Sequence, residues 1–239
     1  MDAVLERSVA DARVYAEAGF SAIVIENFGD TPFFAGRVPA ETVAAMSRAA
    51  VAVREAVGAE MPVGFNVLRN DASSALGLCA ACGGAFLRVN VHTGAMVTDQ
   101  GVIEGKAAET LRLREALGFS ESSRPLLFAD VLVKHAVPLG DLEPGQAARD
   151  TFHRGHADAL IVTGAGTGEA TPLARLRAVR NAVPEAPLFA GSGVTAETVF
   201  ETLAIADGVI VGSSLKTDGD LAKPIDPARA EAFVEAARR

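Results

Sequence analysis

Short apolar runs alternate with longer amphipathic stretches along the whole sequence. The apolar runs are rich in Val, Ile and Leu, which is typical of strands buried on both faces of a sheet. The stretches between them repeat apolar residues every three or four positions, which predicts helices. We expect strands at residues 22–27, 62–68, 86–92, 126–134, 159–164 and 208–215, and a further one that begins at Leu188 and ends in the small residues that follow it.

Seven predicted strands and eight predicted helices follow one another in strict alternation. Such alternation predicts parallel strands joined by right-handed crossover connections. The expected fold class is α/β, a TIM (β/α)8-type barrel that forms a single domain over residues 1–239. A closed barrel needs eight strands. Because the helix at 3–18 comes before any strand, the first strand is expected to be missing or supplied otherwise.

This missing strand would leave a seam in the barrel. The strands at 22–27 and 208–215 would have unpaired edges, which proteins usually cover. We therefore expect another element or a second subunit to fill part of the seam, and with it a homo-oligomer.

Composition narrows the class of protein. With 49% hydrophobic residues the chain has enough apolar surface for one sizeable core. A net charge of −8 argues against a nucleic-acid partner. No apolar run is long enough for a transmembrane segment. Two cysteines make no disulfide framework, so a cytoplasmic location is expected.

Two glycine-rich turns follow the last two predicted strands. Glycine lets the backbone approach a ligand closely, and free N–H groups after such a turn suit a phosphate. Paired turns near the C-terminus match the phosphate-binding loops of a TIM barrel, although tight packing alone could also require glycine. The expected phosphate-binding residues are Gly191, Ser192, Gly193, Gly212, Ser213 and Ser214.

Alternation within the strands selects the side chains that line the barrel. Arg88, Asn90 and His92 share one face of their strand, and Asp130 and Lys134 share a face of the next. The polar faces should line the barrel, where charges need partners or a ligand. Arg88 and Asp130 could equally form a structural ion pair.

Chemistry can be assigned to this set by residue type. His92, Asp130 and Glu26 are candidates for proton transfer. Lys134 is a candidate for pairing with an anion or for acting as an amine nucleophile. Asn66, Arg88 and Asn90 are expected to orient a substrate.

The remaining candidates have ordinary structural alternatives. Asp71 is either a helix cap or a site carboxylate. Thr163 and Gly164 begin a loop, 163–168, that is expected to face a ligand but matches a dinucleotide fingerprint only loosely. No cofactor is predicted, although Glu26, Asp71 or Asp130 could hold a divalent metal. Cys79 and Cys82, on one apolar helix, are expected to be core residues.

In combination, these motifs resemble the BtpA/SgcQ family over nearly the whole chain. The resemblance is carried by ENFGD at 26–30, NVLRND at 66–71, RVNVHTG at 88–94, TDQG at 98–101, KHA at 134–136, ALIVTG at 159–164, GSGVT at 191–195 and VGSSLK at 211–216. It implies a TIM barrel whose members carry a further strand upstream, followed by a His-Leu-Pro-type segment. One loop of the site is therefore expected to be absent here.

The resemblance implies two different functions. The family takes its name from a photosystem I biogenesis factor, thought to be peripheral to the membrane, while one branch accompanies sugar-metabolism genes. We expect an isomerase, lyase or hydrolase that acts on a small phosphorylated molecule, a sugar or nucleoside phosphate. The alternative is a non-enzymatic biogenesis or stability factor for a membrane complex.

Overall fold

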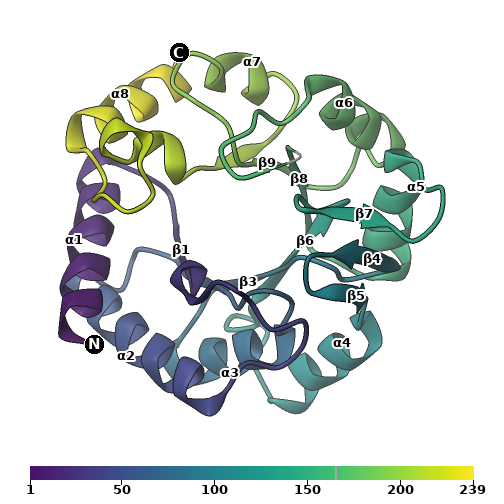
Figure 1. The fold of residues 1–239 in the computed structure, drawn as a ribbon, viewed down its shortest axis with the longest axis horizontal. Coiled ribbons are helices and arrows are strands. Elements are labelled where there is room, and N and C mark those ends of the chain that lie inside the picture. Colours follow the sequence, from purple (N-terminus) through teal and green to yellow (C-terminus); the bar gives the residue numbers. More distant parts are fainter. Residues whose placement is uncertain (165) are drawn as a thin grey trace.

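The computed structural model describes residues 1–164 and 166–239 as a curled parallel sheet surrounded by helices (Figure 1). The strands of the sheet are β1 (Ile23–Glu26), β2 (Val63–Asn66), β3 (Phe86–Val89), β6 (Leu126–Val131), β8 (Ala159–Thr163), β9 (Leu188–Gly191) and β10 (Gly208–Ile210). They lie side by side in the order β1-β2-β3-β6-β8-β9-β10, and all six pairings are parallel. The prediction of an α/β barrel with seven strands is confirmed.

Helices form the outer ring in Figure 1. They are α1 (Asp2–Ala18), α2 (Ala40–Val57), α3 (Ala72–Cys82), α4 (Ala107–Ala116), α5 (Pro144–Arg149), α6 (Leu173–Ala182), α7 (Val199–Leu203) and α8 (Pro227–Ala237). The helix α1 ends at Gly19, whose φ of 87° lies in the left-handed region that glycine adopts without a steric cost. At α8, Asp226 accepts hydrogen bonds from the N–H groups of Ala228 and Arg229, and Pro227 occupies the first turn.

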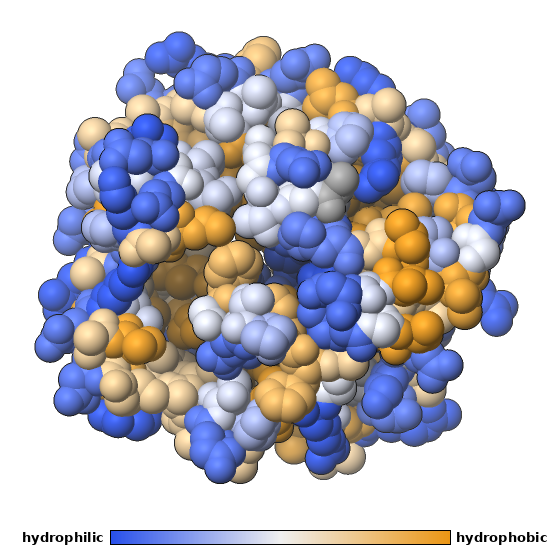
Figure 2. Space-filling model, in the orientation of Figure 1, coloured by the Kyte–Doolittle hydropathy of each residue, from blue (hydrophilic) through white to orange (hydrophobic). Residues whose placement is uncertain are grey.

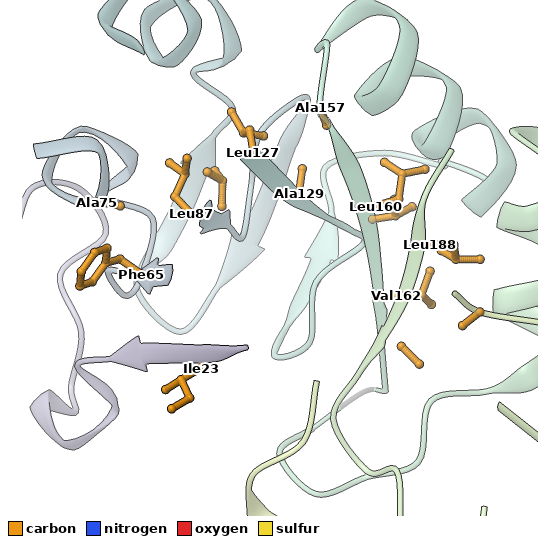
Figure 3. Close-up of a cluster of buried hydrophobic side chains, with 14 of the residues drawn as sticks. Ile23, Phe65, Ala75, Leu87, Leu127, Ala129, Ala157, Leu160, Val162 and Leu188 are labelled. Carbon is orange, nitrogen blue, oxygen red and sulfur yellow. The ribbon is translucent and has the colours of Figure 1, made fainter. Parts of the chain in front are cut away.

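The main apolar core lies between the sheet and the helix ring (Figure 3). Phe65, Leu87, Leu127, Leu160 and Leu188 come from five successive strands, and each is at most 1% exposed. Because side chains alternate along a strand, these residues face the helices and leave the alternate positions to line the inside of the barrel.

The sheet does not close on itself. Among the described residues β1 pairs only with β2 and β10 only with β9. The side chains of both edge strands are mostly half-buried, while those of β8 are all buried. The two predicted edges at the seam are therefore confirmed. Figure 2 shows a hollow with an apolar floor beside this seam, on the left of the view. A further element or subunit at the seam remains a prediction.

The helix ring continues across the seam where the sheet is open. α1 packs against α8, and the rings of Phe20 and Phe233 stack with their centroids 6.0 Å apart. Asp11 on α1 accepts hydrogen bonds from the amine of Lys216 and from the backbone N–H of Ile225, both in the segment after β10. These contacts join the first and last helices of the chain.

A second, smaller sheet lies in the connections that follow β3 and β6. β4 (Ala95–Thr98), β5 (Gly101–Glu104) and β7 (Ala136–Pro138) pair antiparallel in the order β5-β4-β7. The main strands before them are correspondingly shorter than predicted, since β3 ends at Val89 and β6 at Val131. The chain thus leaves the barrel earlier than the apolar pattern indicates. The small sheet that follows lies at one side of the barrel, on the right of the view in Figure 1, where β6 and α5 also lie.

Candidate functional site

A continuous chain of polar contacts crosses the inside of the barrel from β1 to β6. The amide of Asn66 on β2 donates to Oε1 of Glu26 at 2.8 Å, and Nη1 of Arg88 on β3 lies 3.5 Å from the same oxygen. Arg88 then donates to both carboxylate oxygens of Asp130 on β6, at 3.1–3.2 Å, and Asn90 donates to Asp130 as well. Strand alternation thus brings five of the predicted residues together.

The Arg88–Asp130 pair forms the buried centre of this chain. Their side chains are 6% and 0% exposed. Burial opposes the charge on Arg88, but the carboxylates of Asp130 and Glu26 and the hydrogen bond to Asp130 raise its pKa above the ordinary value. Both oxygens of Asp130 have donors, whereas the Glu26 side chain is 25% exposed. Of the two carboxylates, Glu26 is the one that a ligand in the mouth can reach.

Arg69 is a site residue that the sequence pattern does not identify. It lies in the loop after β2, is 4% exposed, and donates from Nη2 to the carbonyl of Lys134. Its Nε has no hydrogen-bond partner, and no carboxylate lies within ion-pair distance of it, among the described residues. Burial is the main cause that lowers its pKa. A buried guanidinium with spare donors suits an anionic ligand.

Lys134 lies three residues beyond the end of β6, at the mouth. Its backbone N–H donates to Oγ1 of Thr163 at 2.9 Å. Burial lowers the pKa of its amine, Arg88 and Arg69 lower it further, and the carboxylates of Glu26 and Asp130 oppose the shift. Within the part of the chain that the structure describes, the amine makes no hydrogen bond and no ion pair.

His92 does not join this group. Its Nε2 lies 2.7 Å from the carbonyl oxygen of Gly155, which belongs to the outer layer of the barrel. The charged groups that act on its pKa are Arg114 and Asp158. Because β3 ends at Val89, alternation no longer determines which way residue 92 faces. The expectation that His92 lines the barrel beside Asn90 and Asp130 is therefore corrected.

Two other predicted residues have structural hydrogen bonds. Asp71 is the N-cap of α3: it accepts from the N–H of Ser74 at 3.0 Å and from the N–H of Val38 at 2.9 Å. Thr163 is fully buried and bonds to the backbone of Lys134. Gly164 follows it, and a Cβ there would lie 2.4 Å from the carbonyl of Glu169. The predicted loop 163–168 includes residue 165, which lies outside the described residues.

The predicted phosphate loops follow β9 and β10, at the same end of the barrel. Gly191 is close to the polar chain, since a Cβ added to it would lie 3.8 Å from Nη2 of Arg88. Gly193 has a φ of 68° and packs against the backbone of Glu169, whereas the space beside Gly212 is open. The backbone N–H groups of four residues make no hydrogen bond to another described residue. They are Gly193, Val194, Ser213 and Ser214.

No group of three or more His, Cys, Asp or Glu side chains among residues 1–164 and 166–239 could hold a metal ion. Cys79 is buried in the core, and burial raises its pKa to about 12, so its thiol stays protonated. None of the helices described has both the length and the apolar character needed to cross a bilayer.

Comparison with known proteins identifies the family. The model of the BtpA family matches residues 1–239. The chain belongs to the BtpA family. It is 45% identical to the photosystem I biogenesis protein BtpA of Synechocystis sp. over 99% of this chain and 80% of that protein. It is 33% identical to the sgc region protein SgcQ of Escherichia coli, over 98% of this chain and 85% of that protein.

Solved structures with a similar backbone show the fold of this BtpA-family chain. Phosphoribosyl anthranilate isomerase from Thermus thermophilus has a TM-score of 0.62 at 16% identity, over 96% of this chain and 94% of that one. A structure described as native KDPGal has a TM-score of 0.62 at 17% identity, over 98% and 89% of the two chains. At such identities the likeness extends to the TIM-barrel fold alone.

Proposed function

We propose that this protein is an enzyme that acts on a small phosphorylated metabolite, bound at the barrel mouth. The observation that carries the proposal is the excess of unpaired hydrogen-bond donors there. Arg69 and Lys134 have no carboxylate partner among the described residues, and four backbone N–H groups in the loops after β9 and β10 have no acceptor. Although the net charge of the protein is −8, these donors at the mouth have no acceptor, and such a group of donors favours an anionic ligand.

The mouth would have two parts, one that binds the phosphate and one that carries out the chemistry. The N–H groups of Gly193, Val194, Ser213 and Ser214 would hold the phosphate, as free backbone donors do in other anion sites. Glu26 would exchange protons with the substrate, because its carboxylate is partly exposed beside the buried Arg88. Asn66 and Asn90 would hold Glu26 and Asp130 in place. The solved structures with this fold include enzymes whose names describe a phosphoribosyl substrate, which agrees with the proposal.

Thermal unfolding in the presence of phosphate, ribose 5-phosphate and dihydroxyacetone phosphate tests this function. A ligand at 100 times its Kd stabilises the folded state by about 2.7 kcal/mol. For a chain of this size that corresponds to a rise in Tm of roughly 5–10 °C. Gly212→Val should abolish the rise, because its side chain would enter the open space beside the loop after β10. Gly77→Val, at an exposed and equally open helix position, is the control and should keep it.

A second function, docking onto a protein complex as an assembly factor, is favoured by one surface feature. Val97, Val102 and Val137 lie directly opposite one another across β5-β4-β7 and are 38–60% exposed, and Leu139 nearby is 67% exposed. Figure 2 shows this apolar patch on the right of the view. Contiguous exposed apolar surface often marks an interaction site. A Tm that responds to no phosphorylated compound would favour this docking function over catalysis.

A further inference from the structure

The four lysines of the chain have different surroundings. Lys216 is paired with Asp11 at 2.5 Å, and Lys223 with Asp218 at 2.6 Å. Lys106 is exposed on the outer surface. Lys134 alone of the four is half-buried without a carboxylate at ion-pair distance among the residues described.

The amine of Lys134 lies among charged groups at the mouth. Arg69 and Arg88 are fixed cations, because guanidinium groups do not lose their protons in proteins. Burial and these two guanidinium groups lower the pKa of Lys134, although Glu26 and Asp130 oppose the shift. A lysine that is desolvated beside other cations is available as a neutral amine, which is the nucleophilic form.

We propose that the Lys134 amine forms an imine with the carbonyl carbon of a small phosphorylated aldehyde or ketone. The proposal rests on the proposed function, since the phosphate loops would bring the carbonyl to the mouth. Lys134 carries a free amine, and the same mouth holds Glu26 as a partly exposed carboxylate and the donors of Arg69.

Imine formation needs no reactant besides the amine and the carbonyl compound. The amine nitrogen adds to the carbonyl carbon, so a C–N bond forms and the carbonyl oxygen takes a proton. The hydroxyl of this adduct takes a second proton and leaves as water, which breaks the C–O bond, while the nitrogen loses its one remaining hydrogen to form the C=N bond. Both protons that the oxygen gains come from the amine, and Glu26 can carry them between the two atoms. An imine then withdraws electrons from the neighbouring carbon, which suits bond cleavage or proton transfer there.

Reductive trapping tests the proposal. The full chain is incubated with dihydroxyacetone phosphate and sodium cyanoborohydride at neutral pH, and the modified lysines are mapped by peptide mass spectrometry. We expect the adduct at Lys134 to exceed that at each of the other three lysines at least tenfold. Lys134→Arg, which keeps the charge and loses the amine, should remove the adduct. Lys106→Arg, a matched change at an exposed lysine, should leave it unchanged.

Thermal-shift measurements on Lys134→Arg with inorganic phosphate separate the two proposals. Equal labelling of all lysines, or none, in a protein that phosphate still stabilises would overturn the imine and leave phosphate binding intact. No labelling together with no stabilisation would overturn both. If phosphate still stabilises Lys134→Arg while the adduct is lost, the amine forms the imine and the loops bind the phosphate.

Discussion

His92 is a buried histidine in the folded protein. It is 1% exposed, and its ring meets the carbonyl of Gly155. A carbonyl only accepts, so Nε2 donates a proton to it, and Nδ1 has no partner among the described residues. Burial lowers the pKa of His92 below its ordinary value. A charge on this ring would have no compensating acceptor at Nδ1.

The folding stability should therefore depend on pH through His92. Its pKa is about 6.5 in the unfolded chain and lower in the folded one. Between these two values the unfolded state binds more protons, so stability falls as pH falls below about 6.5. His92→Gln should flatten this decline, by at most about 1.4 kcal/mol per pH unit. Urea unfolding between pH 7 and pH 5 measures the change.

The exposed His156, which makes no ion pair among the described residues, provides the control for this pH dependence. His156→Gln should leave the decline as it is in the parent protein. An unchanged slope in His92→Gln would mean that the ring is not held neutral by burial. Phosphate binding should survive in His92→Gln, because the ring lies outside the barrel mouth.

Sequence alternation places a side chain correctly only while the strand lasts. Arg88 lies within β3 and Asp130 within β6, and both line the barrel as predicted. Asn90 is one residue beyond β3 and still reaches Asp130, but His92 is three beyond and does not. Arg69 could not be found in this way, because it lies in a loop where no periodicity fixes a direction.

At the level of elements, the seven main strands were predictable and the small sheet was not. β-strands buried on both faces leave long apolar runs, which are easy to recognise. β4, β5 and β7 are only three or four residues long, too short for a period of alternation to be recognised. The pairing of β4 with β7 joins segments about 40 residues apart, and a local pattern does not reveal such a pairing.

Hydrogen exchange should distinguish the edge strands from the central ones. The amides of β1 and β10 have a partner strand on one side only, whereas β6 and β8 are paired on both sides. We expect the amides of β6 and β8 to exchange about tenfold more slowly, or slower still, because local opening is easiest where contacts are fewest. Mass-spectrometric exchange at several protein concentrations is the measurement. Equal protection that appears only at high concentration would instead show that a second subunit covers the seam.

Across the whole molecule, charge is distributed unevenly. The net charge is −8, yet the mouth brings three basic side chains, Arg69, Arg88 and Lys134, together with two carboxylates, Glu26 and Asp130. Since Asp130 is committed to Arg88, the remaining donors face the ligand site with little compensation. A local excess of positive charge in an acidic protein attracts small anions and still discourages polyanions such as nucleic acids.

Asp11 makes hydrogen bonds that join the two ends of the helix ring at the seam. Its two carboxylate oxygens accept from the amine of Lys216 and the N–H of Ile225, and the Asp11 and Lys216 side chains are 17% and 15% exposed. These bonds tie α1 to the segment between β10 and α8, where the sheet itself provides no connection. A partly buried pair that bonds in this way contributes more than an exposed one, because its removal leaves a charge and an N–H without partners.

Asp11→Ala should consequently lower the free energy of unfolding by about 3 kcal/mol, since it leaves both donors without an acceptor. Denaturant unfolding measures the loss of stability. Hydrogen exchange should become faster in α1 and α8 before it does in the central strands. Glu17→Ala, an exposed position on the same helix, should stay within about 0.5 kcal/mol of the parent. If Asp11→Ala were as stable as Glu17→Ala, the ring would be held at the seam by the stacking of Phe20 on Phe233 and not by Asp11.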